Sequence, residues 1–190
     1  HRNWCGYTSF YIDITSMIKY GDKLNNIAIR VDANAQEGWW YEGAGIYRHT
    51  WLVKTSPVHL ITDGVYAHPI KKTDGSWTIP VEATVENSGK EKANIEVEAT
   101  LFDKTGKQVI QDKTNASVAA LDKMVTTLSL PVSNPGLWTL DDPTLYKVRT
   151  VIKANGKPAD TLFTTCGFRT IQFTADSGFY LNGQHIKIKG

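Results

Sequence analysis

The sequence predicts an all-β protein whose main part is a β-sandwich. Segments that alternate apolar and polar residues recur about every 8–12 residues, with turn-forming residues between them. No stretch shows the periodicity of an amphipathic helix. Each expected strand has one apolar face and one face that carries Thr, Glu or Lys. Two sheets packed face to face are therefore the expected arrangement.

The composition is that of a soluble globular chain. Of 190 residues, 41% are hydrophobic and 21% are charged, and the net charge is +2. Basic and acidic residues are interspersed, which gives no basis for binding nucleic acid or an anionic membrane. No apolar run approaches the roughly 20 residues that span a bilayer. We therefore expect neither nucleic acid nor a membrane as a partner.

The cysteines and histidines predict no metal site. Cys5 and Cys166 are far apart and fit no metal or redox spacing. Two buried free thiols are expected, and a disulfide between them is the alternative. The five His residues are scattered, so a site built from His is not expected.

The first part of the chain is expected to contain short strands around an aromatic loop. Alternating residues predict strands at 6–14 and 24–31, and small polar residues predict a loop at 32–38. The segment 39–51 combines aromatic residues with two closely spaced glycines, and a short strand is expected at 50–55. Such a loop suits either packing against another domain or stacking on a sugar ring.

The sandwich is expected to begin near Val65, after a turn at Asp63-Gly64. Asn134-Pro135 and Asp142-Pro143 belong to a crossover between sheets, because proline lacks the N–H that a strand ladder needs. A polar connection is expected after residue 111. The expected strands are 65–70, 77–86, 93–102, 107–111, 123–130, 145–152 and 161–166.

The last part of the chain predicts a β-hairpin. Strand-like residues at 179–181 and 186–188 flank Asn182-Gly183, which is the commonest two-residue hairpin turn.

Three motifs resemble glycoside hydrolase family two. Residues 42–48 are similar to the glycine-rich signature that ends the family's sugar-binding jelly roll. Residues 134–146 resemble an Asn-Pro…Leu-Trp…Leu-Tyr element late in its immunoglobulin-like domain. Residues 167–190 resemble the segment that leads into its catalytic barrel. The order matches too, so the resemblance covers essentially the whole chain. Within the family, the motif sequences most resemble those of β-galactosidases. β-Mannosidases and β-glucuronidases share the architecture.

The resemblance implies a division of the chain into three parts. Residues 1–63 correspond to the C-terminal part of a galactose-binding-like jelly roll, here incomplete. Residues 64–171 correspond to the immunoglobulin-like β-sandwich, and residues 172–190 to a short hairpin leading into a missing TIM barrel. Because the first part lacks sheet partners, self-association through residues 1–63 is expected.

The resemblance implies no catalytic residue in this chain. The family cleaves β-glycosides with retention through two barrel glutamates, which must lie about 5–5.5 Å apart. The acid/base follows an Asn-Glu pattern in the family, and no Asn-Glu dipeptide occurs here. No cofactor is expected in this chain, whereas the complete enzyme is expected to use Mg or Na. The sequence does not decide between the bacterial periplasm and the cytoplasm as the compartment.

Candidate site residues cluster around the aromatic loop. The aromatic residues suit either stacking on a sugar or, as the resemblance favours, filling a domain interface. For the two acidic residues the resemblance implies binding of a substrate hydroxyl or a cation, and the default is an exposed carboxylate with no substrate role. The substrate-binding candidates are Glu37, Trp39, Trp40, Tyr41 and Glu42, and the residues with expected structural roles are Gly43, Gly45, Arg48, Trp138 and Arg169.

Two functions remain open at this point. The resemblance implies a non-catalytic part of a retaining, β-galactosidase-like glycosidase, in which the sandwich orients the sugar-binding domain against the barrel. The alternative is a stand-alone carbohydrate-binding or cell-surface β-sandwich module. The alternative predicts sugar affinity centred on residues 39–41, and the enzyme interpretation predicts negligible affinity there.

Overall fold

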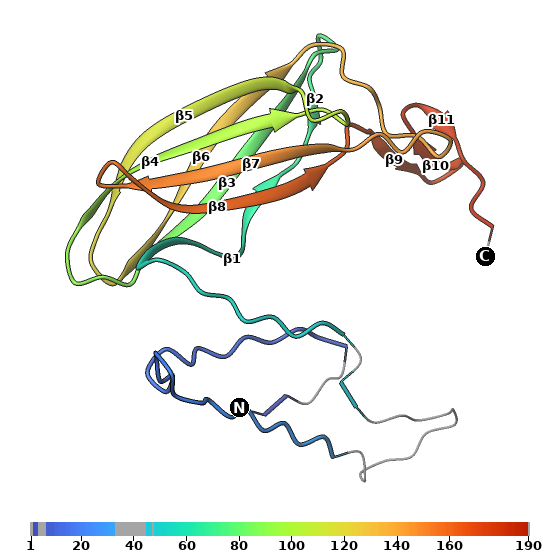
Figure 1. Ribbon diagram of the computed structural model, residues 1–190. Coiled ribbons are helices and arrows are strands. Elements are labelled where there is room, and N and C mark those ends of the chain that lie inside the picture. The colour runs from blue at the N-terminus through green and yellow to red at the C-terminus, as the bar shows by residue number, and fades with distance from the viewer. Residues whose placement is uncertain (1, 4–6, 33–44, 47, 190) are drawn as a thin grey trace. The chain divides into compact units, whose positions relative to one another are not determined.

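The computed structural model describes residues 2–3, 7–32, 45–46 and 48–189 (Figure 1). The chain divides into two compact units, His1–Leu52 and Val53–Gly190, and each is described by itself. In the described ranges, no helix is long and apolar enough to cross a membrane.

The first unit contains no strand in its described residues, so the strands predicted at 6–14 and 24–31 are absent there. The strand predicted at 50–55 is absent as well. A strand needs a neighbour that takes up its backbone hydrogen bonds, and no ladder joins these segments. Their apolar side chains consequently stay exposed, as Leu24 at 87% shows.

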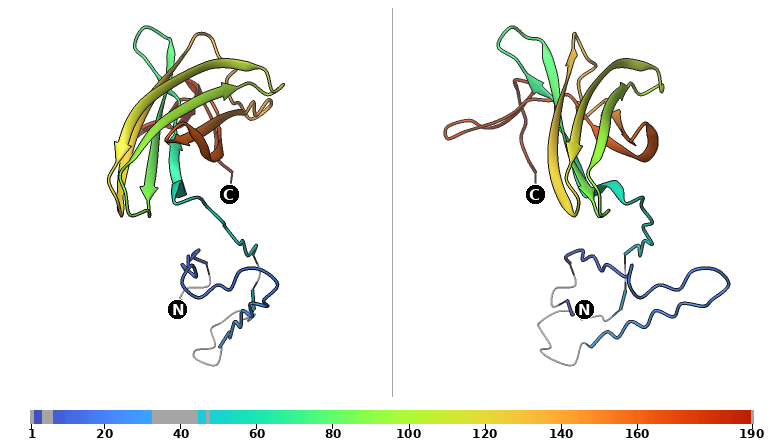
Figure 2. Two further views of the ribbon diagram at one scale, coloured as in Figure 1. Left: turned by 60° about the vertical axis from the view of Figure 1, so that its left-hand side comes forward. Right: turned by 90° about the vertical axis from the view of Figure 1, so that its left-hand side faces the viewer.

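The second unit is an antiparallel β-sandwich of two four-stranded sheets (Figures 1 and 2). In the first sheet, β3 lies between β6 on one side and β1 and β2 on the other. In the second, the order is β5-β4-β7-β8. The prediction of an all-β, immunoglobulin-like sandwich is thereby confirmed. The strands are β1 Val58–Ala67, β2 Ile70–Lys71, β3 Trp77–Asn87, β4 Ala93–Phe102, β5 Gln108–Val118, β6 Asp122–Val132, β7 Tyr146–Ala154 and β8 Lys157–Cys166.

The core lies between the two sheets and follows from the alternation in the sequence. Every second residue of β3 points inward, and so does every second residue of the first half of β4. Each large apolar side chain that is fully buried contributes roughly 1.5–3 kcal/mol. The largest fully buried apolar side chains are those of Phe168, Ile79, Leu101, Leu130 and Ile152.

Strand β5 is longer than predicted, and the prediction of a polar connection after residue 111 is wrong. Residues 112–118 continue the ladder with β4 up to the pair Ala93 and Val118. β5 is an edge strand whose inward-facing positions are mostly only half-buried, and they include the polar residues Asp112 and Thr114. The second half of β5 therefore lacks the apolar alternation from which a strand is predicted.

Strand β1 contains a bulge where a turn was predicted. Leu60 pairs with Val85 and Val65 pairs with Ala83, so residues 61–64 stand opposite Thr84 alone. Asp63 has a φ of 57°. A Cβ at Gly64 would lie 2.9 Å from the backbone oxygen of Ile61 and would also meet the Ile61 side chain. The Asp63-Gly64 pair therefore bends one strand and does not separate two strands.

Aspartates close both seams where the edges of the two sheets meet. Asp160 of β8 accepts a hydrogen bond from the backbone N–H of Leu60 in β1 at 2.9 Å. On the other side, Asp112 of β5 accepts one from the backbone N–H of Ser129 in β6 at 3.1 Å. Each carboxylate satisfies an edge-strand donor that the ladder leaves unpaired.

A small third sheet follows the sandwich, with the order β11-β10-β9. Its strands are β9 Ile171–Thr174, β10 Gly178–Leu181 and β11 Gln184–His185. Asn182 and Gly183 have φ values of 51° and 79°, which confirms the predicted hairpin turn. The strand after the turn is shorter and earlier than the predicted 186–188.

Candidate functional site

The predicted sugar-binding cluster lies outside the described residues. This holds for Glu37, Trp39, Trp40, Tyr41, Glu42 and Gly43, so no cation or sugar site is assigned to them. Two neighbours are described. Gly45 has a φ of 153°, in the region that favours glycine, and Arg48 is exposed within the first unit.

Two of the residues predicted to be structural, Trp138 and Arg169, lie together. The guanidinium carbon of Arg169 lies 4.9 Å from the centre of the Trp138 ring, a cation–π contact. The backbone N–H of Trp138 donates to the carbonyl oxygen of Phe168 at 2.8 Å. A Cβ at Gly167 would lie 3.2 Å from the Cβ of Trp138, so glycine permits this close approach. The crossover around Trp138 thus packs against the segment that leaves β8.

Asn182 joins the hairpin to this crossover. Its Oδ1 accepts from the backbone N–H of Thr170 at 2.9 Å, and its Nδ2 donates to the carbonyl oxygen of Trp138 at 2.9 Å. Its backbone N–H donates to the carbonyl oxygen of Thr170, also at 2.9 Å. We call Trp138, Arg169, Thr170 and Asn182 the latch. The sequence identified Asn182 only as a turn residue, because the partners of its side chain lie far away in the chain.

Phe168 connects the latch to the core. Its side chain is fully buried and meets Tyr146 edge-to-face, with ring centres 4.8 Å apart. It meets Trp77 in the same way at 5.5 Å. The hydroxyl of Tyr146 in turn accepts a hydrogen bond from the backbone N–H of Gly136 at 2.9 Å. The crossover is therefore held at both of its ends.

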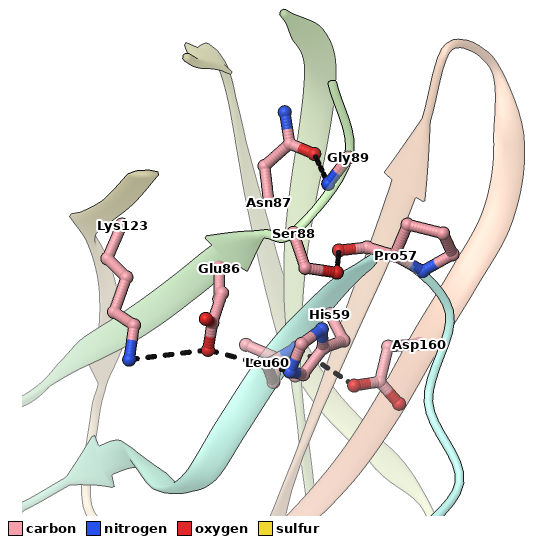
Figure 3. Close-up of polar contacts among 9 residues, drawn as sticks. All are labelled: Pro57, His59, Leu60, Glu86, Asn87, Ser88, Gly89, Lys123 and Asp160. Atoms are coloured by element: carbon pink, nitrogen blue, oxygen red, sulfur yellow. Dashed lines mark hydrogen bonds and ion pairs between the residues drawn. The ribbon is translucent and has the colours of Figure 1, made fainter. Parts of the chain in front are cut away.

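The opposite end of the sandwich holds the chain where β1 begins (Figure 3). The carbonyl oxygen of Pro57 accepts two hydrogen bonds from Ser88, from its backbone N–H at 2.9 Å and its hydroxyl at 3.1 Å. Glu86 lies between two basic side chains, with Lys123 at 3.3 Å and His59 at 3.8 Å. These contacts are structural, since each joins neighbouring strands or loops of the sandwich.

The described residues offer no metal centre and no activated thiol. No group of three or more His, Cys, Asp or Glu that could hold a metal ion occurs among them. Cys166 is a buried free thiol, as predicted, and Cys5 lies outside the described part. Burial raises the pKa of the Cys166 thiol to about 11, which keeps it protonated and inert at neutral pH.

Comparison with known proteins identifies the family to which this architecture belongs. The family model of the glycosyl hydrolases family 2 matches residues 58–169, which contain the whole sandwich from β1 to β8 and the latch residues Trp138 and Arg169. The chain belongs to glycosyl hydrolase family 2, as the three sequence motifs had indicated.

Named relatives cover nearly the whole chain. A β-galactosidase of Bacteroides ovatus, BoGH2A, is 35% identical over 97% of this chain and 22% of its own length. A β-glucuronidase of Formosa agariphila is 30% identical over 100% of this chain and 21% of its own length. The chain thus spans about a fifth of these relatives.

Solved structures agree with this assignment. A family 2 member from Bacteroides cellulosilyticus DSM 14838 superposes with a TM-score of 0.74 at 32% identity. The match covers 81% of this chain and 22% of that chain.

Proposed function

We propose that this chain forms a non-catalytic part of a retaining, β-galactosidase-like glycosidase that hydrolyses O-glycosidic bonds in carbohydrates. The proposal is supported by membership of family 2 and by relatives named as β-galactosidases and β-glucuronidases. Retaining hydrolysis needs two carboxyl groups about 5–5.5 Å apart. We assign neither of them to this chain, so cleavage belongs to residues outside it.

Within the complete protein, the sandwich orients the sugar-binding domain against the catalytic barrel. The latch is the observation that carries this role. Asn182 makes three hydrogen bonds that tie the hairpin to Thr170 and to the crossover at Trp138. Since Phe168 packs those residues onto the buried core, the hairpin has a fixed attachment to the sandwich.

The hairpin also has an apolar face suited to contact another part of the protein. Phe173 and Phe179 are register partners, and their ring centres lie 5.0 Å apart. Phe173 is 72% exposed and Ile171 is 53% exposed. Exposed apolar groups gathered on one face are typical of interaction surfaces. This supports a contact between the hairpin and the barrel of the complete protein.

The test compares the complete protein with its Asn182→Gly variant. Glycine keeps the positive φ of the turn and removes only the two side-chain hydrogen bonds. We expect a lower kcat/KM for a chromogenic β-galactoside, because the loosened hairpin misplaces the barrel. The control is Asp176→Ala, at an exposed position in the β9–β10 turn. Gly183→Ala would not serve, because Gly183 has a positive φ of 79° that alanine rarely adopts. An unchanged kcat/KM in Asn182→Gly would contradict the orienting role.

The isolated chain tests the non-catalytic assignment and the alternative of a stand-alone module. We expect no turnover of chromogenic β-galactosides or β-glucuronides, and turnover would overturn the assignment. We also expect no sugar affinity at the aromatic loop. Saturable binding of galactose that is lost in Trp39→Ala would favour a free-standing carbohydrate-binding module.

A further inference from the structure

An open depression of about 700 Å³ lies on the outer face of the second sheet. It is located where β5, β4 and β7 run side by side, next to the turn between β7 and β8. Its polar lining consists of Asn94, Glu96, Asn115, Lys153 and Asn155. Three of these five side chains are amides, and they come from three different segments of the chain.

The backbone fixes the positions of these side chains. Glu96 is the register partner of Asn115 on one side and of Lys153 on the other. Asn94 and Asn155 are joined in both directions: the N–H of Asn155 donates to the carbonyl oxygen of Asn94 at 2.8 Å, and the N–H of Asn94 donates to Oδ1 of Asn155 at 3.2 Å. The lining is therefore preorganised by strand pairing and by the two-residue turn that contains Asn155.

The one carboxylate in the depression is already paired with two lysines. Oε1 of Glu96 lies 2.7 Å from Nζ of Lys153, and Oε2 lies 3.2 Å from Nζ of Lys113. Hydrogen bonds from these two lysines lower the pKa of the Glu96 carboxyl. A cation would have to displace a lysine, and an anion would face the carboxylate. The chemistry of the lining therefore favours a neutral ligand.

The amides retain hydrogen-bonding capacity. Within the described part of the chain, the side chains of Asn94 and Asn115 make no hydrogen bond, and Asn155 uses only its Oδ1. Each amide offers a donor and an acceptor side by side. Asn94 and Asn155 lie side by side on neighbouring segments, and Asn115 lies diagonally across from Asn94, because its register partner is Glu96. Amides grouped in this way match a ligand whose hydroxyls also donate and accept.

We propose that this depression binds a neutral sugar residue of an oligosaccharide through Asn94, Asn115 and Asn155. The inference rests on the proposed function only for the choice of ligand class. No aromatic ring is among the residues that line the depression, so binding relies on hydrogen bonds and is expected to be of millimolar strength. Because the ligand is neutral, the affinity is insensitive to salt.

The experiment titrates lactose into the ¹⁵N-labelled chain and follows the side-chain NH₂ resonances. We expect saturable shifts of the Asn94, Asn115 and Asn155 signals, with a Kd in the millimolar range. Asn115→Ala should weaken binding at least about fivefold, which corresponds to about 1 kcal/mol. Gln111→Ala is the matched control, because Gln111 is an amide on the same strand and outside the depression. It should bind like the parent.

Three results would overturn the proposal. They are an absence of saturable shifts, an equal effect of Asn115→Ala and Gln111→Ala, and a preference for glucuronate over lactose that disappears in high salt. None of them bears on the proposed function, which is tested by hydrolysis in the complete protein. Conversely, loss of binding in Trp39→Ala with retention in Asn115→Ala would place the sugar at the aromatic loop.

Discussion

Oδ2 of Asp160 lies 2.9 Å from the backbone nitrogen of Leu60 and accepts its hydrogen bond across the seam between the two sheets (Figure 3). The two residues are a hundred positions apart in the chain. The bond holds β1 against β8 just before the bulge, where the ladder between β1 and β3 is interrupted.

Replacing Asp160 by Ala should destabilise the sandwich. The N–H of Leu60 would lose its acceptor in a partly buried place, which costs about 1–3 kcal/mol. Chemical denaturation should show this decrease in the free energy of unfolding, with an unchanged m-value. Asp176→Ala, at an exposed turn, should change it by less than about 0.5 kcal/mol. Equal effects of the two substitutions would show that the Asp160 bond contributes nothing to stability.

Asn87 is a second position where one polar side chain holds distant loops. It is 1% exposed, and its Nδ2 donates to the carbonyl oxygens of Glu91 at 2.8 Å and Ala119 at 3.0 Å. Its Oδ1 accepts from the N–H of Gly89 at 2.9 Å. Asn87→Ala leaves these groups unpaired, so we expect a loss of about 2–4 kcal/mol in thermal or denaturant unfolding. Asn115→Ala, which is exposed, is the control and should leave stability unchanged.

Phe168 should be among the most sensitive apolar positions. It is fully buried between Trp77 and Tyr146. Phe168→Ala removes both ring contacts and leaves a cavity, which costs about 3–5 kcal/mol. Phe163→Ala, at a position that is 64% exposed, removes an aromatic ring without opening a cavity. A similar midpoint of unfolding for the two variants would contradict the central place of Phe168.

Cys166 gives the sandwich a dependence on alkaline pH. Burial raises its pKa from an ordinary value of 9.0 to about 11. The folded state therefore holds the thiol proton more tightly than the unfolded state. The stabilisation is complete below about pH 9 and disappears as the pH rises toward 11. Cys166→Ala should flatten the stability profile between these two values. If the free energy of unfolding fell equally with pH in the parent and in Cys166→Ala, Cys166 would not be the source of the pH dependence.

The same burial predicts slow thiol labelling. A thiol-specific reagent at pH 8 should modify Cys166 only as fast as the sandwich opens, because the thiolate is the reactive form. Labelling should become fast in denaturant. Rapid labelling under native conditions would show that Cys166 is accessible.

The sequence predicted best those parts of the fold in which hydrophobic alternation is complete. β3 and the first half of β4 lie with one face in the core, so their period of two was plain in the residues. β5 was predicted only in part, because polar residues, Asp112 and Thr114, occupy half-buried inward positions of this edge strand. The turn predicted at Asp63-Gly64 is a bulge, since turns and bulges use the same residues and differ only in which residues pair on either side.

The candidate site was less accessible to sequence reasoning. Trp138 and Arg169 were identified through motifs, yet their contact depends on a crossover that returns to the end of β8. The role of the Asn182 side chain depends on a carbonyl oxygen 44 residues away. The amides of the outer depression carry no motif, and only strand register assembles them.

The crowding at Gly64 has a consequence for how this domain can vary. Any side chain there meets the side chain of Ile61 and also its backbone oxygen at 2.9 Å, so we expect the bulge to be lost and β1 to straighten. Straightening would slide half of the strand past β3 and turn its inward residues to solvent. In a library that randomises residues 61–64 and is sorted for folded protein, survivors should diversify at 62 and retain glycine at 64.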